Sequence, residues 1–423
     1  MLSLLWIPLF LASAYTAQAA TSYSLKEAVR YALEHSPSLS SDNQRERIAE
    51  LAESNATSKF FPSLDVTSTH GVEKESPKKS TDPWVSSLNL SASENLYDNG
   101  QSLTQHKIAR LGHDIASLTF QRNRQKLTLD VVVQFYRYSV AHALAEVKRQ
   151  QSGIFSQQYE VVSGQYKQGL RTKREFLRLK SQAQRGEIDL QDSLIEVDRT
   201  RVELARLMGL SSSEAEFKEV SIDTLPKTIP QKKPEVEQTL DYRIASAKRN
   251  IAPEQLSLAE RNYWPQVYLT TGVNYDNSGY LGGGSTQTYG WNALLAIKYN
   301  LWDWGIKRRE METARRNALI SDNDLTTARQ STIADISNVM LDLKQRQNNF
   351  KAAKNLLEIE ETNYGLLKRD YESGKVTSYD LILNLNDLLG ARVLFYTAQF
   401  GLAEGVARYQ FYDGNLYEAL SIE

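Results

Sequence analysis

The sequence contains few of the side chains that enzymes and metal sites require. It has no cysteine, five histidines and four methionines in 423 residues, which removes thiolate chemistry and leaves little for metal binding. The motifs HExxH, GxSxG and CxxC are missing. Ser373-Gly374-Lys375 lacks the upstream glycine and the following hydroxyl residue of a phosphate loop. We therefore expect no enzymatic activity, no cofactor and no metal site.

Two acidic residues have duplicated surroundings. Glu175 lies three residues after Thr172, and Asp380 lies three residues after Thr377. Each threonine closes a Tyr-x-x-Gly-x-x-Thr element, at 166–172 and 371–377. An acid in the first turn of a helix complements the helix dipole. That role accounts for both residues and does not exclude a second one.

These elements belong to a longer internal repeat. Residues 96–100 (LYDNG) match 301–305 (LWDWG) at an offset of 205, the offset that also relates the two Tyr-x-x-Gly-x-x-Thr elements. Phe60-Phe61-Pro62 matches Tyr263-Trp264-Pro265 at an offset of 203. Because these elements recur in the same order and at nearly the same spacing, the sequence indicates two copies of one unit. We expect a first repeat at 20–210, a linker at 211–234, a second repeat at 235–413 and a C-terminal tail at 414–423.

The N-terminus has the pattern of an export signal. Residues 4–15 form an apolar run, and Ala17-Gln18-Ala19 fits a cleavage site. We predict a signal peptide at 1–19, with a buried N-terminal helix as the alternative. Lys and Arg number 50 against 51 Asp and Glu, so no basic surface points to a nucleic-acid partner.

Proline is missing from 84–225 and after 265, which permits long helices. We expect helices of 68 residues at 101–168 and 306–373, each about 100 Å long at ~1.5 Å per residue. Return helices follow at 172–208 and 377–412. Shorter helices are expected at 25–59, broken at Pro37, and at 236–262, containing Pro253. A coiled-coil stripe follows 3/4 spacing at Ile336, Met340, Leu343, Phe350 and Leu357.

Each repeat also contains two segments that alternate between apolar and polar residues, as half-buried strands do. They lie near 64–72, 84–92, 266–275 and 289–301, with loops at 73–83 and 277–288. Strands of about 9–12 residues with aromatic flanks are typical of transmembrane strands. Four strands cannot close a barrel, so a membrane location requires several chains to share one. The alternative is an ordinary amphipathic sheet packed on the helices.

Together these residues resemble the TolC-type outer-membrane efflux protein family. The resemblance rests on residues 23–28 (YSLKEA), the two aromatic-Pro elements, the two Leu-x-Asp-x-Gly elements and the two Tyr-x-x-Gly-x-x-Thr turns. It implies a mainly α-helical fold with a small β part. Three chains with four transmembrane strands each would share a 12-stranded barrel above a long α-helical coiled-coil tunnel, with 211–234 and the C-terminus at its equator.

The resemblance also implies a setting. The chain would lie in the outer membrane of a Gram-negative bacterium, in contact with its lipid and with most of its length in the periplasm. It would export passively, with a periplasmic adaptor (membrane fusion) protein and an inner-membrane pump or ABC transporter as partners. Small-molecule efflux and type I protein secretion both remain open. The competing class is a soluble periplasmic coiled-coil adaptor or scaffold.

Site residues follow from the same resemblance. It places a periplasmic gate at Glu175, Tyr371 and Asp380. The adaptor-docking tip falls on Gly169, Leu170, Thr172, Gly374, Lys375 and Thr377. Two positions depart from the family pattern: Val376 replaces an arginine, and Leu383 replaces a second acid. We expect Arg171, Lys173 and Arg174 to pair with Asp380 in the closed state instead.

Overall fold

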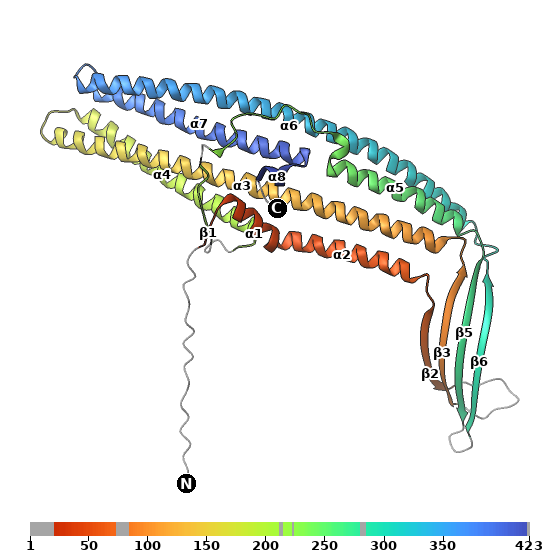
Figure 1. The fold of residues 1–423 in the computed structure, drawn as a ribbon. Helices are drawn as coiled ribbons and strands as arrows, with labels where there is room; N and C mark the ends of the chain where they lie inside the picture. The colour runs from red at the N-terminus through yellow and green to blue at the C-terminus, as the bar shows by residue number, and fades with distance from the viewer. Residues whose placement is uncertain (1–20, 73–83, 211–214, 222–223, 280–284, 421–423) are drawn as a thin grey trace, which may run out of the picture.

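A computed structural model of the chain describes residues 21–72, 84–210, 215–221, 224–279 and 285–420. The signal peptide expected at 1–19 and the loop expected at 73–83 lie outside them. Figure 1 shows an elongated molecule with a sheet at one end and two helical turns at the other. The prediction of a mainly helical fold with a small β part is confirmed.

Two long helices set the length of the molecule. Helices α3 (Gln101–Lys167) and α6 (Ile306–Glu372) have 67 residues each, which corresponds to about 100 Å. Helices α4 (Lys173–Met208) and α7 (Ser378–Asp413) return along half of that length with 36 residues each. We call α3 with α4 the first hairpin and α6 with α7 the second hairpin. The expected helix bounds agree to within one residue.

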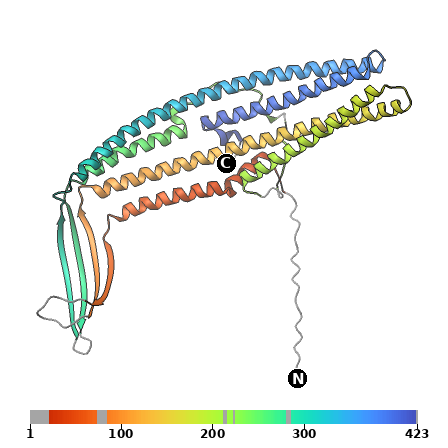
Figure 2. The same ribbon diagram turned by 180° about the vertical axis from the view of Figure 1, so that it is seen from behind.

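Shorter helices cover the half of the molecule nearest the sheet, as Figure 2 shows from behind. Helix α1 (Leu25–His35) ends before Pro37, which begins α2 (Pro37–Ser58) and so confirms the expected break. Helix α5 (Leu240–Arg261) contains Pro253. It begins later than expected because Val236–Gln238 forms the 3-10 turn η2, after which Thr239 caps the helix.

Four antiparallel strands form the sheet, in the order β2-β3-β5-β6. They are β2 (Ser63–Val72), β3 (Trp84–Tyr97), β5 (Gln266–Gly279) and β6 (Ser285–Lys298). The loop expected at 277–288 was wrong at both ends, because the backbone ladder continues through polar pairs such as Asn277 with Gln287. Since β3 pairs with β5, the two repeats join side by side at the centre of the sheet.

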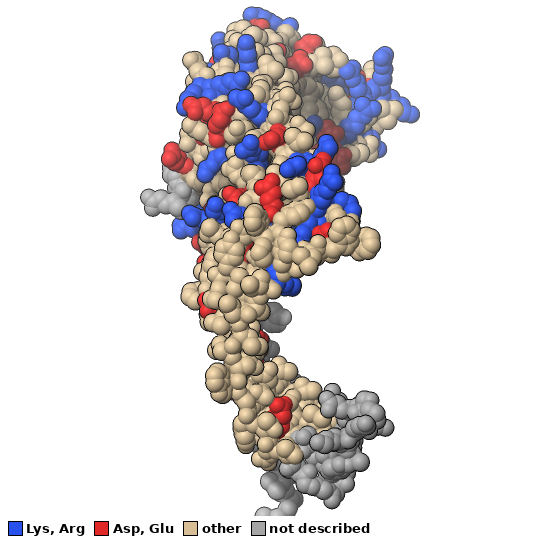
Figure 3. Space-filling view, turned by 90° about the vertical axis from the view of Figure 1, so that its right-hand side faces the viewer, with Lys and Arg blue, Asp and Glu red and all other residues tan. Residues whose placement is uncertain are grey.

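The register places most of the apolar residues of the four strands on one face. Leu90 lies opposite Val273, and Val273 lies opposite Trp291. This face is exposed, with Trp291 80% and Ile297 71% accessible, so the sheet does not pack on the helices as the alternative interpretation required. The other face carries polar residues, including Asn89, Asn274 and Asn292. Figure 3 shows few charged residues at this end of the molecule and many on the helical part.

The main hydrophobic core lies midway along α3. Val131, Val132 and Phe135 are fully buried there with Leu204 and Met208 of α4. A short parallel ladder of β1 (Thr21–Tyr23) and β4 (Ala215–Phe217) crosses this point. Helix α8 (Leu416–Leu420) adds a fully buried leucine to the same core, at its first residue. The stripe expected on α6 is buried at Ile336, Leu343 and Phe350.

Candidate functional site

The two hairpin turns lie together at the end of the molecule farthest from the sheet (Figure 1). Gly169 and Gly374 have φ angles of +75° and +76°, a left-handed conformation that glycine adopts without steric cost. The amide of Leu170 donates to the carbonyl of Gln165, and that of Lys375 donates to the carbonyl of Asp370, both at 2.9 Å. This pattern is the Schellman ending of a helix. It explains why both turns need glycine at this position.

Both return helices begin with a capping box. The hydroxyl of Thr172 accepts the Glu175 amide at 3.3 Å, while the Glu175 carboxylate accepts the Thr172 amide at 3.2 Å. Thr377 and Asp380 repeat this exchange at 3.3 and 3.1 Å. Two helix-end donors are satisfied reciprocally in each box. The Thr-x-x-acid spacing therefore first of all starts a helix.

Hydrogen bonds hold both carboxylates in the charged form. The backbone amide of Thr172 is the main cause that lowers the pKa of Glu175. The Thr377 hydroxyl and then its amide lower the pKa of Asp380. Donors to a carboxylate stabilise its ionised form. Each turn thus presents an exposed, permanently negative oxygen pair at neutral pH.

The predicted gate residues are divided between the hairpins, with Glu175 on the first and Tyr371 and Asp380 on the second. Within the described residues no hydrogen bond or ion pair joins Glu175 to Asp380, and none reaches the side chain of Tyr371, which is 41% exposed. Arg171 contacts Glu175 of its own turn at 3.4 Å. In this structure the Asp380 carboxylate accepts hydrogen bonds from Thr377. Within the described residues it makes no ion pair with Arg171, Lys173 or Arg174.

Sequence reasoning missed the contact that joins the two hairpins near their turns. The Nη2 of Arg178 on α4 donates to the Tyr379 hydroxyl on α7 at 2.6 Å. The guanidinium also lies over the Tyr379 ring, 4.3 Å from its centroid, the geometry of a cation–π contact. The two residues are 201 positions apart and do not correspond in the repeat, so no local pattern pairs them.

The docking residues predicted by resemblance all lie at the surface of the turns. Leu170 is the largest apolar side chain of the first turn and is 69% exposed. Behind it the ring of Phe176 stacks on Tyr166, with centroids 4.9 Å apart and planes at 15°. Leu381 occupies the position of Phe176 in the second hairpin. The first turn is therefore braced by a pair of stacked rings, whereas the second turn has a tyrosine and a leucine at the same two positions.

The Leu-x-Asp-x-Gly elements make the joints between sheet and helices. Asp98 accepts the amides of Gly100 at 2.9 Å and Ser102 at 2.7 Å, and Asp303 accepts those of Gly305 and Lys307 in the same way. The residues Asn99 and Gly100 both have positive φ, as do Trp304 and Gly305. Two left-handed residues turn the chain sharply, and the aspartate then caps the long helix.

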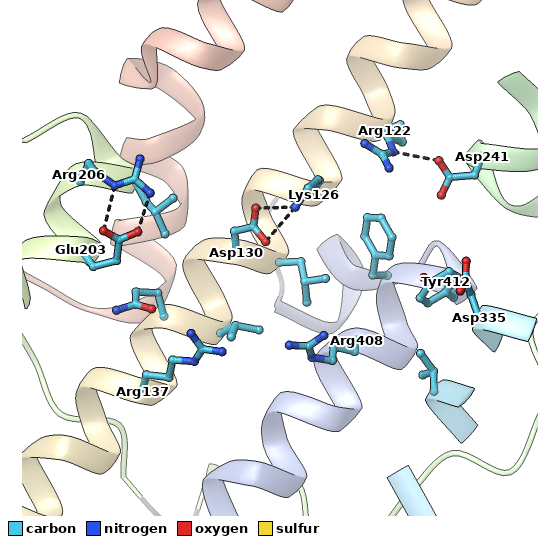
Figure 4. Close-up of a pocket in the computed structure, with 16 residues that line it drawn as sticks. Arg122, Lys126, Asp130, Arg137, Glu203, Arg206, Asp241, Asp335, Arg408 and Tyr412 are labelled. Atoms are coloured by element: carbon cyan, nitrogen blue, oxygen red, sulfur yellow. Dashed lines mark hydrogen bonds and ion pairs between the residues drawn. The ribbon is translucent and has the colours of Figure 1, made fainter. Parts of the chain in front are cut away.

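A charged cavity of about 550 Å³ lies where the two hairpins separate at mid-length. Figure 4 shows its charged side chains, which come from α3, α4, α5, α6 and α7. Arg122 pairs with Asp241 at 3.0 Å, and Lys126 pairs with Asp130 at 3.0 Å. Arg137 and Arg408 point into the cavity from opposite sides. The molecule therefore has a charged hollow at this level.

Among the described residues, no cluster of three His, Asp or Glu side chains is arranged to hold a metal. In the same part of the chain, none of the helices is long and apolar enough to cross a membrane.

Comparisons with known proteins agree with this geometry. The family model described as outer membrane efflux protein matches residues 28–210 and 236–418. The chain is similar in structure to the Campylobacter jejuni CmeC outer membrane channel, with a TM-score of 0.76 and 15% identity over 93% of this chain and 86% of that one. The Neisseria gonorrhoeae MtrE outer membrane channel in its open state gives a TM-score of 0.76 and 17% identity, over 93% and 89% of the chains. The outer membrane protein VceC of Vibrio cholerae gives 0.72 and 17%, over 94% and 97%. A comparison with curated protein sequences found no match.

Proposed function

The chain belongs to the outer membrane efflux protein family, and on this premise we propose that it forms the exit duct of a tripartite efflux pump or a type I secretion system. It is an outer-membrane protein with a long periplasmic part. Three copies would share one barrel, and cargo would pass through it without energy from this component. Family membership does not favour the soluble scaffold.

One observation carries the barrel shared between chains. The sheet exposes an apolar face, and its edge strands β2 and β6 each have a side that pairs with no other strand among the described residues. Lipid tolerates neither an unpaired strand edge nor an open sheet. Pairing β6 of one chain with β2 of the next satisfies both edges and closes the sheet on itself. The resemblance to the TolC-type family sets the number of chains at three, which gives 12 strands, a number within the range of known barrels.

The two faces of the sheet differ in polarity, as expected for strands between lipid and a water-filled channel. The apolar face with Trp291 and Ile297 would contact lipid, and the polar face with Asn89, Asn274 and Asn292 would line the channel. The helices continue the wall below the membrane for about 100 Å. The repeats at 20–210 and 235–413, the linker at 211–234 and the tail at 414–423 would divide each chain, with the linker and the tail packed at the equator.

We place the gate and the docking tip at the far end of the helices. Glu175, Tyr371 and Asp380 would surround the closed aperture, where carboxylate rings attract cations. A periplasmic adaptor would bind the docking tip, formed by Gly169, Leu170, Thr172, Gly374, Lys375 and Thr377. An inner-membrane pump or ABC transporter would complete the assembly. The contact of Arg178 with Tyr379 would hold the two hairpins of one chain together when the aperture is closed.

The first test is the mass of the mature protein in mild detergent, measured by light scattering together with the mobility of unheated samples on a gel. We expect a detergent-bound particle of three chains. A detergent-free monomer or dimer would mean that the strands form a soluble sheet and would overturn the shared barrel.

A further inference from the structure

The two hairpin ends differ in charge although they share one backbone design. We compare the first hairpin end, residues 167–180, with the second hairpin end, residues 372–385, which corresponds to it at the offset of 205. The first hairpin end has six basic residues and one acid, whereas the second has one basic residue and two acids. None of the six basic positions is basic in the second copy. The pairs are Lys167/Glu372, Arg171/Val376, Lys173/Ser378, Arg174/Tyr379, Arg178/Leu383 and Lys180/Leu385.

Two of these cations stand where a helix disfavours them. Lys173 and Arg174 are the first two residues of α4, next to the positive end of the helix dipole. Cations there lower helix stability, whereas acids raise it. Only Glu175 opposes this effect in the first turn. Functional sites are where proteins break such local rules, so these two positions are candidates for a binding role.

Most of the cations are free to bind something else. Arg171 contacts Gln165 and Glu175, and Arg178 contacts Tyr379. The side chains of the other four are exposed and make no hydrogen bond or ion pair within the described part of the chain; they are Lys167, Lys173, Arg174 and Lys180. In the second hairpin end, by contrast, Lys375 contacts Asp370 at 3.5 Å.

The first turn also has the form of a prepared binding surface. Leu170 projects from its tip with 69% of its surface exposed, and the stacked rings of Tyr166 and Phe176 brace the hairpin behind it. An apolar anchor surrounded by charges is the usual anatomy of a protein interface. A braced turn loses little conformational entropy when it is bound.

We propose that the first hairpin end is the seat of an acidic protein partner, a helical hairpin of the periplasmic adaptor that carries Asp or Glu around an apolar residue. This inference rests on the proposed function. Leu170 would supply the apolar contact, while Lys167, Lys173, Arg174 and Lys180 would steer and orient the acidic hairpin. The second hairpin end would contribute little to this attraction, since it carries no excess of basic residues.

The test compares two double charge reversals of equal size. In K173E/R174E the change falls on the first hairpin end. In K368E/R369E it falls on two exposed cations in the last turns of α6, outside both hairpin ends. A photo-reactive residue at Leu170 in the native host first identifies the adaptor, which is then purified and used as the probe. Binding to the trimer in detergent is measured at low and at physiological salt.

We expect K173E/R174E to weaken adaptor binding by about tenfold or more and to remove its dependence on salt, whereas K368E/R369E stays close to the wild type. Lysines in place of the acids on the adaptor turn should restore binding to K173E/R174E. The milder K173Q/R174Q, which removes two unfavourable charges from a helix start, should fold at least as well and bind with intermediate affinity.

Three outcomes would overturn the proposal: equal loss in both reversals, binding without salt dependence, or an adaptor turn without acids. A change of ion selectivity in planar bilayers, with adaptor binding intact, would also overturn it and assign the cations to cargo instead. These outcomes can be told apart from a failure of the proposed function, because a wild-type protein that is not a trimer would fail the mass measurement first.

Discussion

At the scale of single residues, the acids at the hairpin turns have two roles. Glu175 and Asp380 complete capping boxes with Thr172 and Thr377, so a helix start alone accounts for their spacing. The same bonds hold the carboxylates ionised and fix their direction. A residue that must be negative and well oriented for folding is therefore also suited to line a narrow aperture. The predictions at this scale separate the two roles.

Neutral isosteres test the gate. In E175Q/D380N the side-chain oxygens still accept the threonine amides, so the turns should fold while two charges per chain are lost. We expect a larger single-channel conductance or a weaker preference for cations in planar bilayers. E196Q, which neutralises an exposed acid far along α4 from the turn, is the control. Unchanged conductance and selectivity in the double variant would remove the gate assignment.

A pH series tests the capping role. The folded structure lowers the pKa of both acids from ordinary values of 4.5 and 3.8, so their contribution to stability is present above those values. It is lost as the pH falls through the lowered pKa. We expect amide hydrogen exchange at 172–176 and 377–381, corrected for intrinsic rates, to stay constant from pH 7 to 5 and to rise below about pH 4. A rise above pH 5 would contradict this.

At the scale of elements, the joints between strand and helix set the direction of the long helices. Each joint turns on two consecutive left-handed residues and an aspartate that caps the helix. The two copies differ in their surroundings. A Cβ atom on Gly100 would lie 2.4 Å from the Arg261 Nη1, whereas one on Gly305 would meet only the Arg309 Nη1, at 3.4 Å.

Alanine at these glycines should destabilise the two joints unequally. We expect both G100A and G305A to lower the free energy of unfolding by on the order of 1–2 kcal/mol from the left-handed backbone. G100A should lose more stability than G305A, because Arg261 must also move and its hydrogen bond to the Asn99 carbonyl is disturbed. G112A, in the interior of α3 with open space around it, should gain about 0.5–1 kcal/mol. The thermal midpoints of the variants in detergent rank their stabilities. Equal midpoints for G100A and G305A would contradict the expected difference between the two joints.

Much of this architecture follows from the sequence, because long-range order here is built from local rules. The proline-free stretches permitted long helices, and the motifs at their ends predicted 68 residues where the structure has 67. The 205-residue offset predicted the matching turns. The strand ends were missed because Asn277 and Ser278 pair through their backbones, which hydropathy does not report. The contact of Arg178 with Tyr379 and the stack of Phe176 on Tyr166 were missed because both depend on how helices pack side by side.

At the scale of the whole molecule, the sheet edges decide how chains assemble. The absence of cysteine in the sequence makes paired cysteines a clean probe of those edges. N89C/N274C places two cysteines directly opposite one another on β3 and β5. This pair should form a disulfide within one chain and leave the mass on a non-reducing gel unchanged.

Cysteines on the outer edges should instead link chains. T67C on β2 combined with single cysteines at successive polar-face positions of β6, such as N292C, should give a cross-linked trimer at one register. Each single variant alone should remain at the mass of one chain under the same denaturing conditions. Absence of interchain products across the whole scan would argue against pairing of β6 with β2.

The pairing of β3 with β5 places the two repeats of a chain next to one another in the wall. In the proposed trimer, six hairpin ends would then surround the axis, alternately basic and nearly neutral. Backbone geometry would approach sixfold symmetry, while charge would keep only threefold symmetry. A ring of identical partners would therefore find two kinds of position on this end, three that attract acidic surfaces and three that do not. Gene duplication followed by divergence of one copy is a simple route from a uniform ring of sites to an alternating one.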